Sequence, residues 1–242
     1  MNNYQFCVNW VLDQGKDLQV LDYGCGAGEV VRDLRKRGVS AFGCDVFYEG
    51  GDTSDAIDAG LMGSSIRKMD GASIPFGDGS FDLVINNQVM EHAEDLDVVL
   101  RDIARVLKPG GVVLSLFPDG SVWREGHSGV PFLHWFSKGS RPRLYYAAAC
   151  RVVGLGSHKK KWKGIMYWSR HKCDWLDKWT FYRTEPEIAA AYGKYFDGLR
   201  HIEHEWLRQR HAVVARMPAA LQRIVVRKLA GLVFIASRRE AL

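Results

Sequence analysis

The chain has 242 residues, of which 47% are hydrophobic and 25% charged, and its formal net charge at pH 7 is +5. It has no run of about 18 uncharged apolar residues and no basic start followed by an apolar stretch, which disfavours a transmembrane helix and a signal peptide. Five cysteines without C-x-x-C spacing favour reduced thiols in a cytoplasmic protein over a disulfide framework or a zinc site.

Strand and helix patterns alternate along the first half of the chain. A short amphipathic helix is expected over residues 4–15, and a compact apolar strand over 18–24 ends at a glycine. Further strands are expected over 39–46, 81–88 and 111–117, with helices over 28–38 and 95–111. This alternation predicts an α/β fold with a doubly wound, mostly parallel sheet.

The pattern changes after Phe117. Residues 118–143 read as an ordered loop rich in Gly, Pro, Ser and aromatics, and helices are expected over 143–156 and from the capping-box pair Thr184 and Glu187. A strand is expected over 199–207, an amphipathic helix over 218–231 and a final strand over 232–239. Cations flank the apolar face of 218–231, so peripheral membrane contact is an alternative to packing of this helix on the sheet.

The segment "LDYGCGAGEV", residues 21–30, places glycines at positions 24, 26 and 28 directly after an apolar strand. A glycine turn lets a ligand approach the backbone, and the following helix offers free N–H groups. In a parallel sheet this turn lies at the carboxyl ends of the strands, where ligands bind. The spacing is G-x-G-x-G, which differs from the G-x-G-x-x-G of dinucleotide-binding proteins.

Residues 18–118 resemble the class I S-adenosylmethionine-dependent methyltransferases of the UbiE/type-11 group. Segment 21–30 is similar to their motif I, and residues 69–116 resemble the group along their whole length. The resemblance implies a Rossmann-like, seven-stranded α/β fold with a helical or loop insertion after strand five. It also implies S-adenosylmethionine as cofactor and methyl transfer as the activity.

The resemblance implies a set of cofactor-binding residues. Asp45 ends the second strand, where the family uses an acid on the ribose hydroxyls, and Asp70 lies where the family contacts the adenine amino group. The full predicted set is Asp22, Tyr23, Gly24, Cys25, Gly26, Gly28, Asp45, Val46, Asp70, Gly71, Ala72, Asn87 and Gln88. For Asp22, the alternative is a carboxylate that only caps the turn.

Histidine is the natural base if the methyl acceptor is a hydroxyl, because its proton must leave near the transition state. The candidates are His92, His127 and His134, and each has a purely structural role as the alternative. Related quinone-pathway O-methyltransferases carry E-x-x-E-H and bind a divalent metal there. The first position here is Gln88, so no metal is predicted.

The distribution of charge along the chain bears on the class of the methyl acceptor. Residues 1–120 carry 10 Lys and Arg against 19 Asp and Glu, whereas residues 121–242 carry 23 against 9 and seven of the eight Trp. The basic half is either a solvated face or the side that meets an acidic acceptor. We predict O-methylation of a small molecule, or of a sugar in a glycan or glycolipid. "NNQV" stands where an N-P-P-Y sequence would indicate nucleic acid, which disfavours that partner.

Several alternatives stay open at this point. One is an RNA methyltransferase or another N- or C-methyltransferase, and another is a methyltransferase-fold protein that binds a partner without catalysis. The predicted organisation is one domain: residues 1–118 bind the cofactor, 119–200 form an acceptor-side lid, and 201–242 complete the same domain. No oligomeric state is predicted.

Overall fold

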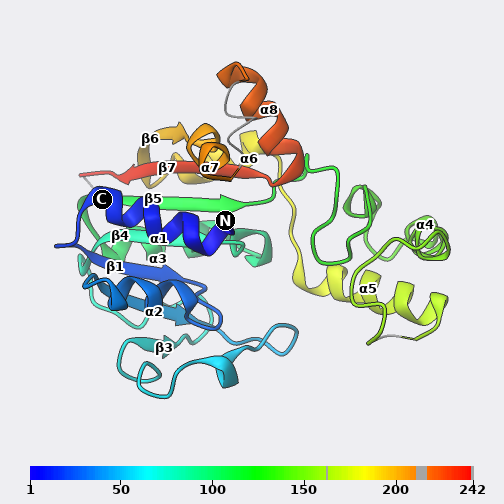
Figure 1. Cartoon of the computed structure of the whole chain (residues 1–242), viewed down its shortest axis with the longest axis horizontal. Coiled ribbons are helices and arrows are strands. Elements are labelled where there is room, and N and C mark those ends of the chain that lie inside the picture. Colours follow the sequence, from blue (N-terminus) through cyan, green and yellow to red (C-terminus); the bar gives the residue numbers. More distant parts are fainter. Residues whose placement is uncertain (162, 211–216, 241–242) are drawn as a thin grey trace.

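The computed structural model describes residues 1–161, 163–210 and 217–240. Its centre is a twisted seven-stranded sheet with helices on both faces (Figure 1). The strands are β1 Gln19–Tyr23, β2 Ser40–Asp45, β3 Ile66–Lys68, β4 Phe81–Asn87, β5 Leu107–Phe117, β6 Phe196–His201 and β7 Leu232–Arg238. Their order is β3-β2-β1-β4-β5-β7-β6, and only the pairs made by β7 are antiparallel. The predicted fold class is confirmed.

The helices between these strands follow the predicted alternation in the first half of the chain. They are α1 Asn3–Gln14, α2 Glu29–Lys36, α3 Leu96–Val106, α4 Arg141–Val152, α5 Ile165–Trp179, α6 Glu185–Tyr192, α7 Glu203–Arg210 and α8 Ala219–Leu229. Three short 3-10 turns are η1 Ser54–Ala56, η2 Met90–His92 and η3 Leu133–Trp135. Among the helices described, none combines the length and apolar character needed to cross a membrane.

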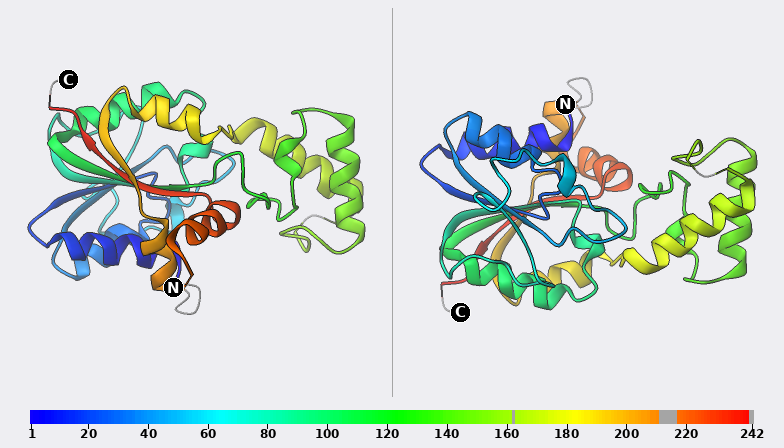
Figure 2. Two further views of the ribbon diagram at one scale, coloured as in Figure 1. Left: turned by 90° about the horizontal axis from the view of Figure 1, so that it is seen from above. Right: turned by 90° about the horizontal axis from the view of Figure 1, so that it is seen from below.

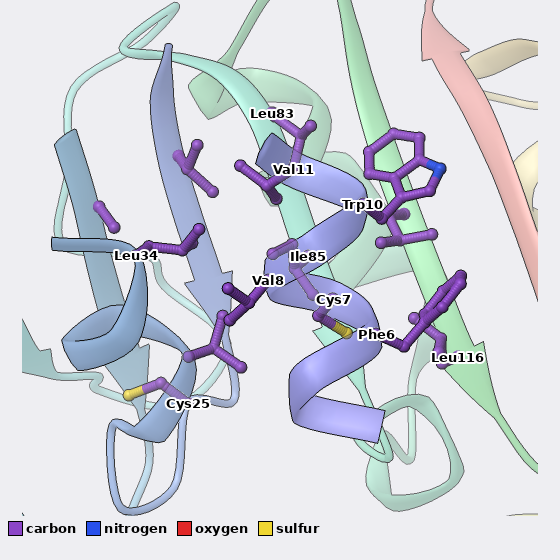
Figure 3. Packing of buried hydrophobic residues seen from close by; sticks show 14 of the residues in the cluster. Phe6, Cys7, Val8, Trp10, Val11, Cys25, Leu34, Leu83, Ile85 and Leu116 are labelled. Carbon is purple, nitrogen blue, oxygen red and sulfur yellow. The ribbon is translucent and has the colours of Figure 1, made fainter. Parts of the chain in front are cut away.

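Two layers of helices sandwich the sheet, as the views of Figure 2 show, and an apolar core cluster lies on each face of it. On one face α1 packs Phe6, Cys7 and Val11, all fully buried, against strand residues such as Ile85 (Figure 3). A capping box at Asn2 starts this helix. On the other face α3 and α6 cover β4, β5 and β7. The two layers leave the carboxyl ends of the parallel strands open to a ligand.

The chain leaves the sheet after β5 and returns to it at α6. We call the intervening residues 119–183 the lid; they carry α4 and α5, which lie beyond the strand ends (Figure 1). The lid has a small apolar core of its own, built around Trp168 and Leu176, both fully buried. Within the longer range 119–200 expected for the lid, α6 and β6 pack with the sheet.

The strand expected over residues 199–207 is wrong beyond His201. β6 ends there, and α7 begins at Glu203. Ile202, Trp206 and Leu207 are buried together. In α7 the adjacent Trp206 and Leu207 lie about 100° apart around the helix, so both can face the core, whereas a strand would point them to opposite faces. Tertiary burial therefore decided between two periods that the short apolar pattern left ambiguous.

Candidate active site

The glycine turn after β1 has a backbone that only glycine adopts readily. Gly24, Gly26 and Gly28 have φ values of 73°, 50° and 72°, in the left-handed region. A Cβ atom on Gly24 would overlap the side chain of Val89. Gly28 precedes α2 without any side-chain cap, so the first N–H groups of that helix are not occupied by a capping side chain. A ligand can therefore come close to the backbone of this turn and accept hydrogen bonds from the first N–H groups of α2.

Asp45, at the end of β2, holds this turn in place. One carboxylate oxygen accepts from the backbone N–H of Gly26 and the other from that of Phe47, both at 2.9 Å. Each oxygen retains a further lone pair for a ligand hydroxyl. Asp45 thus connects the end of β2 to the glycine turn after β1, the place where the sequence predicts the ribose.

Asp22 is buried inside β1, with 4% of its surface exposed. Burial, and then the charge of Asp45, raise the pKa of the Asp22 carboxyl to about 8. At neutral pH this carboxyl therefore holds a proton when no cation is near. A positively charged ligand group would stabilise the ionised form.

The remaining residues of the predicted cofactor set lie at the same edge of the sheet. Asp70 and Gly71 are exposed in the turn after β3, and Ala72 is partly buried. Asn87 ends β4 and accepts from Asn3 of α1 at 3.2 Å. Tyr23 and Cys25 are buried beside the glycine turn, whereas Val46 is exposed.

Gln88 has an unusual backbone for a non-glycine residue, with a φ of 61°. Its backbone N–H and its side-chain amide both donate to the carbonyl of Leu116, at 2.7 and 3.3 Å. These bonds tie the end of β4 to β5. The side-chain amide of Gln88 is thus hydrogen-bonded to the backbone of β5.

Three titratable side chains meet beside this edge. Glu91 and His92 of η2 and His127 of the lid each place a potential ligand atom within 4.8 Å of the others. His92 Nδ1 lies 2.6 Å from the carbonyl oxygen of Trp179; since a carbonyl only accepts, Nδ1 carries the hydrogen and Nε2 is unprotonated in the neutral ring. Burial lowers the pKa of His92, which favours that neutral ring. The structure therefore brings two of the three predicted histidines together.

Glu125, which the sequence analysis did not single out, orients His127. Its Oε1 lies 2.8 Å from His127 Nδ1 and accepts from the hydroxyl of Tyr182 at 2.8 Å. Burial alone would raise the pKa of Glu125, but hydrogen bonds from His127 and Ser128 and the charge of His127 lower it to about 2. The ionised carboxylate holds the proton on Nδ1 and leaves Nε2 as the basic nitrogen of His127.

His134, the third candidate base, is not part of this group. Its ring stacks on that of Tyr182, with centroids 4.6 Å apart, and burial lowers its pKa. Tyr182 in turn donates to Glu125, so the side chains of Tyr182 and Glu125 lie between His134 and His127 in this series of contacts. The contacts fit a packing role for His134.

Aromatic rings connect the lid to the loop after β2. The ring of Tyr48 lies 4.7 Å from Trp179 and 5.9 Å from His92, and the ring of Trp175 lies 4.9 Å from His127. Trp175 also donates its indole N–H to the carbonyl of Gly50 at 3.2 Å. These flat rings pack against the histidines and partly shield them, although 27% of the His127 side chain stays exposed.

Glu91, His92 and His127 could also hold a divalent cation. Each histidine has its Nδ1 hydrogen-bonded, which leaves Nε2 to act as a ligand. Both oxygens of Glu91 are buried without a hydrogen-bond partner among the described residues, and burial raises its pKa to about 7. The expectation that no metal binds stays a prediction.

Comparison with known proteins decides the family. Residues 21–115 match the family described as "Methyltransferase domain". Residues 21–115 are thus a methyltransferase domain of the class I S-adenosylmethionine-dependent type. This confirms the resemblance stated from the sequence and assigns S-adenosylmethionine as the cofactor of the domain.

Two curated relatives of this methyltransferase domain each match 40% of the chain. A ubiquinone biosynthesis O-methyltransferase of Maricaulis maris is 33% identical over 100 residues, 40% of this chain and 39% of the relative. A sterol 24-C-methyltransferase (erg-4) of Neurospora crassa is 36% identical over 100 residues, 40% of this chain and 26% of the relative. The chain thus covers about two fifths or less of the length of these two relatives.

A solved structure shares the fold over nearly the whole length. An S-adenosylmethionine-dependent methyltransferase from Mesorhizobium loti superposes with a TM-score of 0.56 at 17% identity, covering 97% of this chain and 96% of that one. At this identity the likeness concerns the fold alone.

The residues at the strand ends of the methyltransferase domain fit S-adenosylmethionine. The cofactor carries positive charge on its sulfonium and amino groups, which suits a buried carboxyl such as Asp22 that forms no ion pair with any described residue and keeps its proton up to about pH 8. The glycines at positions 24, 26 and 28 lack side chains and allow the close approach that such a ligand needs. The individual cofactor contacts stay predictions.

Replacing Asp45 by alanine should lower the affinity for S-adenosylmethionine at least ~10-fold. The change removes a charge-assisted acceptor worth about 1.5–3 kcal/mol and frees the N–H of Gly26. Isothermal titration calorimetry measures the effect, with Asp13→Ala, an exposed acid on α1, as the matched control. Unchanged affinity in the Asp45 variant would remove this residue from the cofactor site.

Proposed function

We propose that the chain transfers the methyl group of S-adenosylmethionine to a hydroxyl oxygen of a small molecule or a sugar. The observation that carries the proposal is the Glu125–His127 pair, which presents a basic nitrogen beside the carboxyl ends of the strands. Methyl transfer to a hydroxyl oxygen needs such a base because a neutral hydroxyl is a poor nucleophile.

His127 and Glu125 have different roles in the proposed reaction. His127 Nε2 takes the hydroxyl proton as the oxygen attacks, and the ionised Glu125 stabilises the imidazolium that forms. The cofactor supplies the electrophilic methyl group. Trp175 and Tyr48 pack against the histidines and partly shield them from water, which strengthens the interaction of Glu125 with His127.

The acceptor class is argued from the lid. The flat faces of Trp175 and Trp179 suit the stacking of a sugar or an aromatic ring. The excess of cations after residue 120 favours an acceptor that carries phosphate or carboxylate. The names of the relatives do not decide between acceptors, since they include both O- and C-methyltransferases and each of these two relatives matches 40% of the chain.

The cellular setting is part of the same proposal. All five cysteines are free and buried in the structure. Free thiols favour a reducing compartment, which supports the predicted cytoplasmic location.

The test is a methyl-transfer screen with S-adenosylmethionine that carries a radiolabelled methyl group. Quinols, free and lipid-linked sugars, amines and RNA are offered as acceptors, and the labelled product is identified by mass spectrometry. We expect label on a hydroxyl oxygen. Label on a nitrogen, a carbon or RNA would overturn the O-methylation, and failure to bind the cofactor in calorimetry would leave a non-catalytic binding protein.

A further inference from the structure

The end of the lid where α4 turns into α5 is strongly basic. We call residues 151–170 the tip. Ten Lys and Arg, and no Asp or Glu, occur between Glu125 and Asp174. Within the tip, Lys160, Lys163 and Arg170 are exposed. Among the described residues, no ion pair involves Lys160, Lys163 or Arg170.

The same segment exposes large apolar side chains. Six of the 18 large hydrophobic residues that are exposed in the described part of the chain fall within residues 152–167, with 40–74% of their surface accessible. They are Val152, Val153, Leu155, Ile165, Met166 and Tyr167. Contiguous apolar exposure beside cations is typical of an interaction surface rather than of a solvated face.

Contacts within the tip bring these residues to one place. The guanidinium of Arg151, at the end of α4, lies 5.9 Å from the ring of Trp168 in the first turn of α5. The indole N–H of Trp168 donates to the carbonyl of Ser157 in the connecting loop, at 2.9 Å. The end of α4, the loop and the start of α5 thus form one surface, at the end of the molecule away from the sheet (Figure 2).

We propose that the tip docks onto an anionic lipid bilayer. Lysine and arginine would meet the headgroup phosphates and carboxylates, and the aliphatic side chains would enter the interfacial layer. Nucleic acid fits less well, because Val153, Leu155 and Ile165 have no flat face on which a base could stack. This surface is distinct from the methyl-transfer chemistry and does not depend on it.

The other basic, apolar surface of the molecule is less suited to a bilayer. α8 exposes Leu221, Ile224 and Leu229. Two of its three cations, Arg223 and Arg227, form ion pairs with Glu185 at 3.0 and 2.5 Å, and the third, Lys228, donates to the carbonyl of Ser121 at 3.2 Å. Peripheral contact through α8 stays a prediction from the sequence, whereas the tip combines exposed apolar groups with the exposed cations Lys160, Lys163 and Arg170.

Docking at the tip would place the bilayer beside the acceptor side of the site. The hydroxyl of Ser157 donates to the carbonyl of His127 at 2.6 Å, so the loop of the tip is tied to the lid segment that carries the proposed base. A membrane-borne hydroxyl compound would then be presented close to His127.

Vesicle co-sedimentation of the full chain tests the docking. The probes are vesicles of phosphatidylcholine alone and of phosphatidylcholine mixed with phosphatidylserine. We expect salt-sensitive binding to the anionic vesicles only. The charge variant Lys160→Gln/Lys163→Gln/Arg170→Gln should lower the partition coefficient at least about tenfold. A second variant, Val153→Ser/Leu155→Ser/Met166→Gln, should lose binding while its charge is unchanged.

A matched control removes three exposed cations from the opposite part of the molecule. Lys16→Gln/Lys36→Gln/Arg37→Gln changes the net charge equally and should bind anionic vesicles like the parent chain. Circular dichroism and cofactor titration verify that every variant is folded. Absence of binding to the anionic vesicles, or equal loss in the tip and control variants, would overturn the proposal. Binding of single-stranded RNA that only the charge variant loses, without vesicle binding, would reassign the tip to nucleic acid.

Discussion

Replacing His127 by alanine is expected to lower the turnover number about 100- to 10,000-fold, the usual contribution of a positioned general base. The affinity for S-adenosylmethionine should not change, because His127 belongs to the lid and not to the strand ends. Steady-state kinetics with the acceptor found in the screen, together with calorimetry of the cofactor, separate the two effects. His204→Ala, on α7, is the matched control and should retain full turnover.

Glu125 acts through His127 as a positioning residue, so its variant needs a readout beyond rate. In Glu125→Gln the neutral amide no longer stabilises the imidazolium that forms during transfer, so the pH–rate profile of the variant should differ from that of the parent while the affinity for the cofactor is unchanged. Turnover should fall as well. Full activity in His127→Ala would contradict the assigned base. Loss of parent activity on chelation, restored by a divalent cation, would assign Glu91, His92 and His127 to a metal instead.

Binding of S-adenosylmethionine is expected to release a proton from Asp22. Burial and the charge of Asp45 raise the pKa of this carboxyl to about 8, and a bound cation favours the carboxylate. The affinity should therefore rise by up to about tenfold per pH unit between about pH 6 and pH 8. Calorimetry in two buffers of different ionisation enthalpy counts the released protons. In Asp22→Asn the proton release attributed to this residue should disappear and the affinity at pH 8 should fall.

The same carboxyl makes the cofactor-free protein less stable as the pH rises. The unfolded chain releases this proton near pH 4, while the folded chain keeps it to about pH 8, so the free energy of unfolding falls across that window. The slope is about 1.4 kcal/mol per pH unit, which sums to a loss on the order of 5 kcal/mol at pH 8. Urea unfolding of Asp22→Asn should show that this decline is removed, with Asp13→Asn as the exposed control. Parallel pH dependences of the variant and the parent would contradict the buried, protonated state.

Local patterns in the sequence were sufficient for the cofactor-binding part. The apolar run before Gly24, the alternate glycines and the acid at Asp45 all report on neighbouring backbone, so their spacing alone predicted strand, turn and helix. The Thr184–Glu187 capping box marked the start of α6 in the same way. Such signals are readable because one strand and the following turn are built from consecutive residues.

The acceptor side was decided by the tertiary structure. Glu91 and His92 precede His127 by more than 30 positions, and Trp175 follows it by almost 50, so no local period relates them. Glu125 carried one weak signal, its spacing of two from His127, which acquires meaning only when the buried Glu125 contacts both His127 and Tyr182. The sequence by itself thus determined the sheet, the glycine turn and the cofactor class. The partners of His127, and the helix in place of a strand after His201, required long-range burial, because that alone determines which distant side chains share a desolvated site.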